Sequence, residues 1–206
     1  MKTQTKNIQD NQTPKDALKI LKDGNNRFVQ DQNASRNLLE QVKETSNGQF
    51  PFAAVLSCID SRVPVEHIFD LGVGDIFSAR VAGNIINDDI LGSLEYSCKV
   101  AGSKILVVLG HTKCGAVTAA CKNVELGNIT TLLSKIKPAV DKVKSNNEDL
   151  NDSAIEEVSL LNIQLSIDRI REESPILAEM EKNNEIEIVG ALYHVANGKV
   201  DFFEGN

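Results

Sequence analysis

Two short stretches of the sequence carry thiol, imidazole and charged groups directly after apolar runs. The first is Cys58-Ile59-Asp60-Ser61-Arg62, and the second is His111-Thr112-Lys113-Cys114. Thiolate and imidazole are the protein ligands that zinc prefers, and His111 and Cys114 can face one ion across a turn. We therefore predict a zinc ion held by Cys58, His111 and Cys114.

Three protein ligands rather than four indicate a catalytic zinc, because catalytic sites keep one position for water. The alternative is that these cysteines are small core residues, since a buried thiol at a strand end is most often only packed there. A lone H-x-x-C spacing is a weak motif. From the spacing alone, a shared metal site and two structural cysteines both stay open.

Asp60 and Arg62 lie two residues apart and would point the same way in an extended chain. One interpretation is a surface ion pair, which would contribute little to stability. The other is a carboxylate locked by a bidentate guanidinium beside the metal. The second interpretation would make this pair the part of the site that acts on substrate.

Other chemistry-bearing residues give weaker signals. Gly72-Val73-Gly74 begins like a dinucleotide-binding loop, but it lacks the third glycine and precedes a strand. Ser61 has no neighbouring base, so a serine nucleophile is not expected. No Cys-x-x-Cys occurs, which disfavours a thioredoxin-like redox centre. We interpret the remaining groups as structural or surface residues: Cys98, Cys121, His67 and His194.

Alternating apolar runs and helical patterns predict the elements that must position these groups. Four runs are typical of buried parallel strands, and a last run after a turn at 196–198 predicts an antiparallel edge strand. The fold class is α/β: a central, mostly parallel sheet flanked by helices, with an N-terminal helical arm. The predicted strands are 52–57, 76–81, 104–109, 186–192 and 199–203.

The helical pattern divides the chain into an arm, residues 1–48, and a zinc-binding α/β domain, residues 49–206, within one unit. We expect residues 1–12 to be frayed and a helix to begin at Thr13-Pro14. Because the arm is amphipathic, it packs either on its own domain or around a second subunit. The other predicted helices are 37–43, 64–68, 88–102, 116–121, 130–144, 153–171 and 174–180, with a polar loop at 145–149.

The composition excludes several classes of protein. The 206 residues are 41% hydrophobic with a formal charge of −7, and no basic cluster is present that would neutralise nucleic-acid phosphates. No apolar run is long enough to span a bilayer, and the first residues do not resemble a signal peptide. We therefore expect a reduced, cytoplasmic protein whose four cysteines are available as thiols.

Three motifs in order resemble the beta-class carbonic anhydrase family: C-I-D-S-R-V-P, F-S-A-R-V-A-G-N and L-G-H-T-K-C-G-A-V. The resemblance covers the chain from about Thr13 onward and is strongest between Gln49 and Val117. It implies a zinc lyase, with one Zn²⁺ per subunit on Cys58, His111 and Cys114 and with Asp60 and Arg62 as a catalytic dyad. The implied reaction is reversible hydration of carbon dioxide to bicarbonate and a proton, by zinc-bound hydroxide oriented by the dyad.

The resemblance also implies a substrate pocket and a partner. Three residues match positions that similar proteins supply from a second subunit, which implies a homodimer or a dimer of dimers: Gln49, Phe77 and Tyr96. Three more match the pocket wall: Ala82, Gly83 and Gly115. Some relatives carry an allosteric bicarbonate site built on a tryptophan where this chain has Val55, so the plant-like, non-allosteric type is expected.

Two other functions fit the same residues. A related hydrolase of carbon disulfide or carbonyl sulfide could use the same zinc chemistry. A non-enzymatic zinc-binding module is the second alternative, and the Asp60–Arg62 pair and the three-ligand set speak against it.

Overall fold

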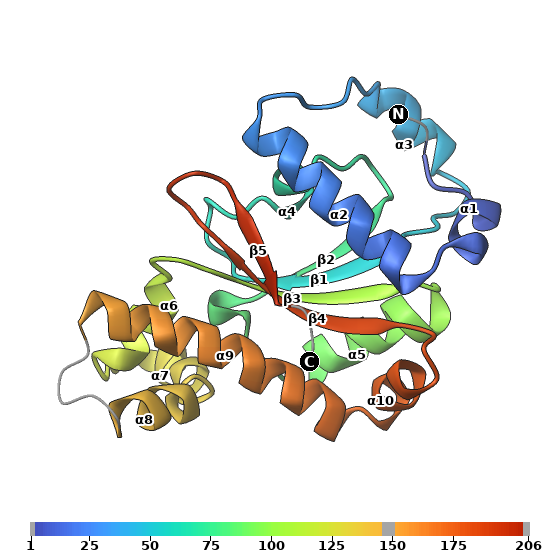
Figure 1. The fold of residues 1–206 in the computed structure, drawn as a ribbon. Coiled ribbons are helices and arrows are strands. Elements are labelled where there is room, and N and C mark those ends of the chain that lie inside the picture. The colour runs from blue at the N-terminus through green and yellow to red at the C-terminus, as the bar shows by residue number, and fades with distance from the viewer. Residues whose placement is uncertain (1–2, 146–150, 204–206) are drawn as a thin grey trace.

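The computed structural model describes residues 3–145 and 151–203, built around one five-stranded sheet (Figure 1). The strand order is β2-β1-β3-β4-β5, with β5 antiparallel to β4 and the other pairings parallel. This confirms the predicted fold class. The strands are β1 (Ala53–Ser57), β2 (Ile76–Arg80), β3 (Ile105–His111), β4 (Glu187–Tyr193) and β5 (Val200–Phe203).

The inner strands β1 and β3 are buried along their whole length, as expected of apolar strands in a parallel sheet covered on both faces. Ser57 at the end of β1 lies opposite Leu109 of β3 in the parallel register. The segments that follow these two residues therefore leave the sheet at the same edge. Strand β2 lies at one edge of the sheet, and its residues are half-buried or exposed.

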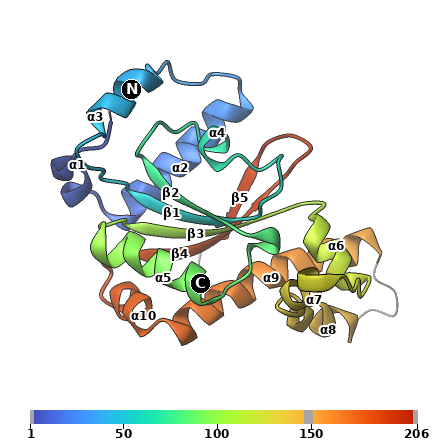
Figure 2. The ribbon, with the colours of Figure 1, turned by 180° about the vertical axis from the view of Figure 1, so that it is seen from behind.

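Helices cover both faces of the sheet, as Figures 1 and 2 show from opposite sides. Successive strand residues point to opposite faces, so Val107 packs with the first layer and Val108 with the second. The first layer consists of α2 (Pro14–Val29) and α4 (Val65–Ile68). The second consists of α5 (Asp88–Glu95), α9 (Asp152–Glu173) and α10 (Pro175–Lys182).

A third apolar cluster lies beyond the carboxyl ends of the strands. Three short helices pack with the beginning of α9 around Ile136 and Val140, both buried. Cys58 and Cys114 belong to this cluster. The helices are α6 (Gly115–Cys121), α7 (Gly127–Ser134) and α8 (Lys137–Lys144), so the predicted single helix over 130–144 is wrong.

Two helix boundaries differ from the predictions for local reasons. The break before α8 places Pro138 in the first turn of a new helix, where its missing N–H costs nothing. Helix α9 is capped by Asn151, whose side chain accepts from the N–H of Ala154 at 3.0 Å, rather than by a box at Ser153. Of the predicted polar loop over 145–149, residues 146–149 lie outside the described residues.

The predicted helix over 88–102 starts as expected, because Asn87 caps it and accepts from the N–H of Ile90. It does not stay α-helical to its end. Residues Tyr96–Val100 form a π-helical turn (η2), closed by the N–H of Ala101 donating to the Tyr96 carbonyl. This turn leaves Tyr96 exposed while Ser97 and Cys98 are buried.

The N-terminal arm is more ordered than the sequence suggested. Helix α1 (Lys6–Asn11) forms where a frayed segment was expected, because buried Gln9 donates to the carbonyls of Pro51 and Ala101 at 2.7 and 2.8 Å. Helix α2 begins at Pro14 with a Thr13 capping box, as predicted. Helix α3 (Leu38–Glu44) follows, capped by Asn37.

An ion-pair network anchors the arm to the loop after α4. The Arg36 guanidinium pairs with the Asp70 carboxylate and donates to the Asp70 carbonyl. Arg27 from the end of α2 donates to the same carboxylate. Among residues 3–145 and 151–203, no helix has the length and apolar character needed to cross a membrane.

Candidate metal centre

The side chains of Cys58, His111 and Cys114 come together at the carboxyl ends of β1 and β3. Their possible ligand atoms all lie within 4.8 Å of one another, and the two Sγ atoms are 4.0 Å apart. The three residues are 4%, 1% and 1% exposed. No other group of this kind occurs in the part of the chain that the structure describes. The predicted ligand set is therefore assembled in one buried cluster.

Local structure explains this convergence. Cys58 directly follows β1, and His111 is the last residue of β3. The chain then turns through Lys113, whose φ of +55° is left-handed, and this turn brings Cys114 to the start of α6. A left-handed non-glycine residue is strained, so the surrounding structure must hold it. One such contact is a hydrogen bond from Arg62 Nη2 to the Lys113 carbonyl at 3.1 Å.

His111 shows that the cluster fits a metal ion. Its Nδ1 lies 3.0 Å from the Thr112 carbonyl oxygen, which favours a proton on that nitrogen. Its Nε2 is buried and has no hydrogen-bond partner among the described residues. An unsatisfied buried nitrogen is costly, whereas two thiols and one imidazole form a zinc-binding set. The residues present therefore fit a zinc ion.

The hydrogen bond between the two thiols shifts their pKa values in opposite directions and favours one thiolate. The hydrogen bond with Cys114 lowers the pKa of the Cys58 thiol to about 4, against the opposing effect of burial. The same hydrogen bond, together with burial, raises the pKa of Cys114. The N–H of Gly83 also donates to Cys58 Sγ at 3.4 Å. One thiolate is thus favoured before any metal binds, and a cation would favour the second.

Asp60 and Arg62 form a bidentate pair next to the cluster. Arg62 Nε and Nη2 donate to the two Asp60 carboxylate oxygens at 2.9 and 2.8 Å, and the Arg62 N–H donates to Oδ1 at 2.9 Å. These hydrogen bonds lower the pKa of Asp60 to about 2, although burial opposes them. Asp60 Oδ2 lies 3.8 Å from His111 Nε2. An ionised carboxylate is thus held at the side of the candidate metal site.

Arg80, which the sequence analysis did not single out, holds the backbone of the same loop. Its Nε donates to the Cys58 carbonyl at 3.0 Å, and its Nη2 donates to the Asp60 carbonyl at 2.6 Å. Arg80 lies inside the F-S-A-R-V-A-G-N motif, so the motif was the available signal. No periodicity or ligand spacing predicts that a strand-end arginine reaches two carbonyls of a neighbouring loop.

The predicted pocket-wall residues lie beside the ligands. Gly83 contacts Cys58 Sγ through its N–H, and its φ of +70° favours glycine. The amide of Asn162 in α9 fixes the Gly83 peptide by donating to its carbonyl at 2.9 Å. Ala82 precedes Gly83, and Gly115 directly follows Cys114, with open space where a Cβ would stand.

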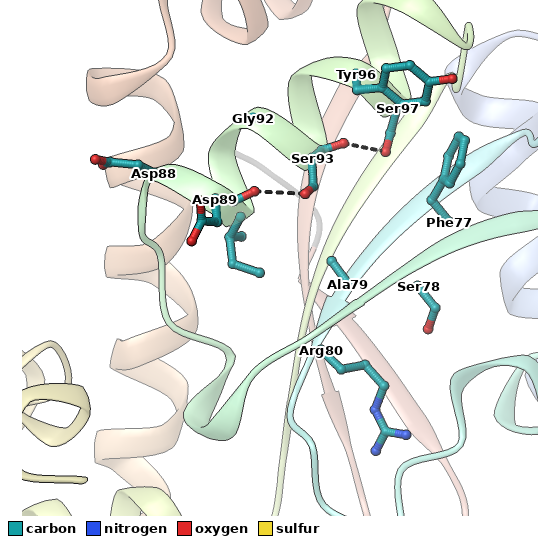
Figure 3. A pocket seen from close by; sticks show the side chains of 11 residues that line it. Phe77, Ser78, Ala79, Arg80, Asp88, Asp89, Gly92, Ser93, Tyr96 and Ser97 are labelled. Carbon is teal, nitrogen blue, oxygen red and sulfur yellow. Dashed lines mark hydrogen bonds between the residues drawn. The ribbon is translucent and has the colours of Figure 1, made fainter. Parts of the chain in front are cut away.

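Phe77 and Tyr96 lie elsewhere on the chain, in a groove of about 800 Å³ along β2 and α5. Figure 3 shows this groove, and the two rings meet edge to face with centroids 6.0 Å apart. The cluster residues do not line the groove. Gln49 is exposed in the segment before β1. Within a single chain, Phe77 and Tyr96 therefore line a groove that is separate from the cluster residues.

The residues interpreted as structural are not part of the Cys58–His111–Cys114 group. Cys98 is buried against the α9 side of the sheet, and Cys121 belongs to the apolar cluster of α6, α7 and α8. His194 pairs with Asp201, with its Nε2 2.9 Å from the carboxylate. Val55 is fully buried in the first core layer, on the α2 side of the sheet.

Comparison with known proteins agrees with this geometry. The family model described as carbonic anhydrase matches residues 53–200. Similar curated proteins include a carbonic anhydrase of Mycolicibacterium smegmatis, 33% identical over 93% of this chain and 94% of that protein. Carbonic anhydrase 2 of Mycobacterium tuberculosis is also 33% identical, over 92% of each chain.

Solved structures give the same result for the fold. A beta-carbonic anhydrase of Aspergillus fumigatus superimposes with a TM-score of 0.75 at 26% identity, over 81% of each chain. A carbon disulfide hydrolase of Acidithiobacillus thiooxidans matches over a shorter stretch, 34% identical across 34% of this chain and 36% of that protein.

Proposed function

The chain belongs to the beta-class carbonic anhydrase family, and we propose that it hydrates carbon dioxide reversibly to bicarbonate and a proton with one zinc ion per subunit. The observation that carries this proposal is the buried Cys58–His111–Cys114 cluster with an ionised carboxylate beside it. When bound there, zinc supplies Lewis acidity that lowers the pKa of water at its open position.

Asp60 has the orienting role in this proposal. An ionised carboxylate only accepts hydrogen bonds, so Asp60 can accept a hydrogen bond from the remaining O–H of the attacking oxygen and direct the lone pair of that oxygen at the carbon of carbon dioxide. Arg62 makes this role possible in two ways. It keeps Asp60 ionised, with a pKa of about 2, and its bidentate hydrogen bonds fix the plane of the carboxylate.

The small residues Ala82, Gly83 and Gly115 form one wall of the proposed substrate pocket. Carbon dioxide offers no charge and only weak acceptors, so its site must be set mainly by shape. A side chain at Gly83 would meet Ile136 at 2.6 Å, which shows how closely the wall packs there. We propose that this wall confines substrate next to Asp60.

We further propose a homodimer in which a partner supplies Gln49, Phe77 and Tyr96 to this pocket. Strand β2 is an edge strand, and exposed edges pair readily with another chain. The groove with Phe77 and Tyr96 follows this edge. Helix α3 adds exposed apolar residues that a partner would cover: Leu38, Leu39 and Val42, which are 52%, 76% and 50% exposed. A dimer of dimers would keep the same pairing.

Two finer proposals concern the type of enzyme and its compartment. Asp60 is engaged by Arg62 rather than turned into the cluster, and Val55 replaces the tryptophan of the allosteric relatives. Both observations favour the plant-like, non-allosteric type. The four cysteines are free thiols, which supports function in the reducing cytoplasm.

Hydrolysis of carbon disulfide or carbonyl sulfide is the alternative reaction. The match to a carbon disulfide hydrolase covers 34% of this chain, whereas the matches to the Mycolicibacterium smegmatis and Mycobacterium tuberculosis carbonic anhydrases cover 93% and 92% of it. We therefore expect hydrogen sulfide release from either compound to be far slower than hydration of carbon dioxide. Assays of the three substrates with one zinc-loaded preparation distinguish the two reactions.

The variant Cys58→Ser tests the proposal. Cys121→Ser is the matched control, because Cys121 is buried nearby but is not one of the three candidate zinc ligands. We expect Cys58→Ser to lose zinc and carbon dioxide hydration together, and Cys121→Ser to keep both. The measurements are zinc content per subunit and stopped-flow hydration rate. Retention of full activity by Cys58→Ser without bound zinc would show that the cluster is not the catalytic centre.

A further inference from the structure

We propose that Arg80 is a positioning residue for the reaction, because it holds the backbone that carries both the first metal ligand and Asp60. The inference rests on the proposed function and extends it to a residue that does not touch substrate. Arg80 lies at the end of β2, and its guanidinium donates to the carbonyls of Cys58 and Asp60 at 3.0 and 2.6 Å. These two carbonyls lie on either side of Ile59.

The loop needs this support because the sheet ends before it. The β1–β2 register stops at Ser57 opposite Arg80, and one more backbone bond follows, from the Val81 N–H to the Ser57 carbonyl at 3.0 Å. Beyond that point, the carbonyls of Cys58 and Asp60 have left the ladder. The Arg80 side chain supplies the donors that the backbone of β2 no longer provides.

The rest of the loop shows why orientation must be imposed. Ile59 is 60% exposed, so apolar packing does not fix the middle of the loop. The Asp60 carbonyl accepts a second hydrogen bond, from the Val63 N–H at 3.0 Å, which closes the turn after it. Arg80 and Val63 together therefore fix the peptide after Asp60, and with it the direction of the Asp60 side chain.

Arginine suits this task better than lysine. The planar guanidinium presents several N–H donors in a rigid fork and can reach two carbonyls at once, whereas an ammonium on a flexible stem acts as a single point. The two arginines of the site thereby divide the work. Arg62 binds the carboxylate of Asp60, and Arg80 binds its backbone.

Arg80 also connects the loop to the β2 edge. It lines the same groove as Phe77 and Tyr96, and in the view of Figure 3 its guanidinium extends away from those two rings. The surface proposed to receive a second subunit is thus continuous with the side chain that positions Asp60. A change in the position of the β2 edge would therefore alter the Arg80 hydrogen bonds to the loop that carries Asp60.

The test compares Arg80→Lys and Arg80→Ala with wild type, all loaded with zinc. A displacement of about 1 Å at a reacting group can lower a rate about a hundredfold. We expect kcat to fall about tenfold in Arg80→Lys and about a hundredfold in Arg80→Ala, with KM and zinc content unchanged. Added guanidinium ion should restore part of kcat in Arg80→Ala, which a general loss of structure would not allow.

Arg169→Lys is the matched control, because Arg169 also donates to a backbone carbonyl, that of Ile86 at 3.4 Å, outside the site. It should keep wild-type kcat. Arg80 variants with kcat within about twofold of wild type, or with kcat lost only in proportion to zinc, would overturn the positioning role. Wild-type protein that fails to hydrate carbon dioxide would overturn the proposed function as well, so the two failures differ. Arg80→Lys keeps the test decisive if Arg80→Ala does not fold.

Discussion

Two aspartates that lie ten residues apart, Asp60 and Asp70, each pair with an arginine. The two pairs differ in sequence separation, burial and place in the fold. The Asp60–Arg62 pair is local, two residues apart, and its side chains are 17% and 48% exposed. The Asp70–Arg36 pair joins residues 34 positions apart, with side chains 3% and 7% exposed. The first lies beside the candidate metal site, and the second joins the N-terminal arm to the loop after α4.

Both aspartates have lowered pKa values, but for different balances of causes. For Asp60, the hydrogen bond from Arg62 dominates. For Asp70, burial is the largest effect and would raise the pKa, but the hydrogen bonds from Arg36 and Arg27 together outweigh it. A low carboxyl pKa therefore does not identify a catalytic group. Position distinguishes the two carboxylates, because of these two aspartates it is Asp60 that lies 3.8 Å from His111 Nε2, beside the candidate metal site.

The largest expected effect is the loss of activity when the Asp60–Arg62 pair is changed. Asp60→Asn replaces an obligate acceptor with a group that can also donate, so the attacking oxygen is no longer aimed. Groups that handle protons in a reaction contribute about 10²- to 10⁴-fold, and we expect a loss of kcat near the middle of that range. Zinc content should stay unchanged and the urea midpoint should change little, because Arg62 is 48% exposed and an ion pair screened by solvent contributes little to stability. Unaltered turnover would remove Asp60 from the mechanism.

The buried pair should show the opposite behaviour. Asp70→Asn removes the buried carboxylate that pairs with Arg36 and Arg27, and breaking a buried ion pair typically costs about 3–5 kcal/mol of unfolding free energy. The rate per folded, zinc-loaded subunit should be unchanged. Urea unfolding and stopped-flow hydration on the same sample measure the two quantities. A variant as stable as wild type would mean that the network does not anchor the arm.

The pH dependence of this stability loss has a definite sign. Because the folded pKa of Asp70 is lowered, its contribution is present above the unfolded value of about 3.9 and is lost as the pH falls through the folded value. The difference in stability between wild type and Asp70→Asn should therefore be largest near neutral pH and should shrink in acid. A difference that grows in acid would contradict the assigned charge state.

A smaller effect is expected from Arg62→Gln. Without the guanidinium, the pKa of Asp60 rises from about 2 toward its ordinary value of about 3.9, and burial raises it further. Because Asp60 must be ionised to act only as a hydrogen-bond acceptor, the acid limb of the kcat profile should move to higher pH. At neutral pH we expect kcat to be about tenfold lower, because the Asp60 carboxylate is no longer held in a fixed orientation. Zinc content at each pH is the control, and an unshifted acid limb would separate Arg62 from the ionisation of Asp60.

The smallest expected effect concerns bicarbonate. If Val55 marks the non-allosteric type, bicarbonate should act as an ordinary product without locking Asp60 away from Arg62. Initial rates at increasing bicarbonate should then follow a simple, non-cooperative inhibition curve. Cooperative inhibition would show that this chain has a second bicarbonate site despite the absence of tryptophan.

The sequence predicted best those features that follow from local pattern. Apolar runs placed all five strands within about two residues, and the Thr13-Pro14 signal placed the start of α2. Features that depend on long-range contacts were missed. Helix α1 forms because Gln9 reaches the carbonyls of Pro51 and Ala101, which no local pattern encodes.

The same division applies to the site. The residue types predicted a ligand set, and the structure brings those three residues together in one buried group. The spacing alone left a core interpretation open for the cysteines, and the resemblance to the family favoured the metal site. The Arg80 contacts depend on how far a side chain reaches across two strand ends, so they required the three-dimensional arrangement.

The most direct test of the central claim is stopped-flow hydration of carbon dioxide by one preparation of the chain before chelation, after chelation and after return of zinc. We expect hydration to disappear with the metal and to recover as zinc reaches one ion per subunit. Asp60→Asn treated in the same way should bind zinc again without recovering the rate. Full turnover by the chelated, zinc-free chain would contradict the account.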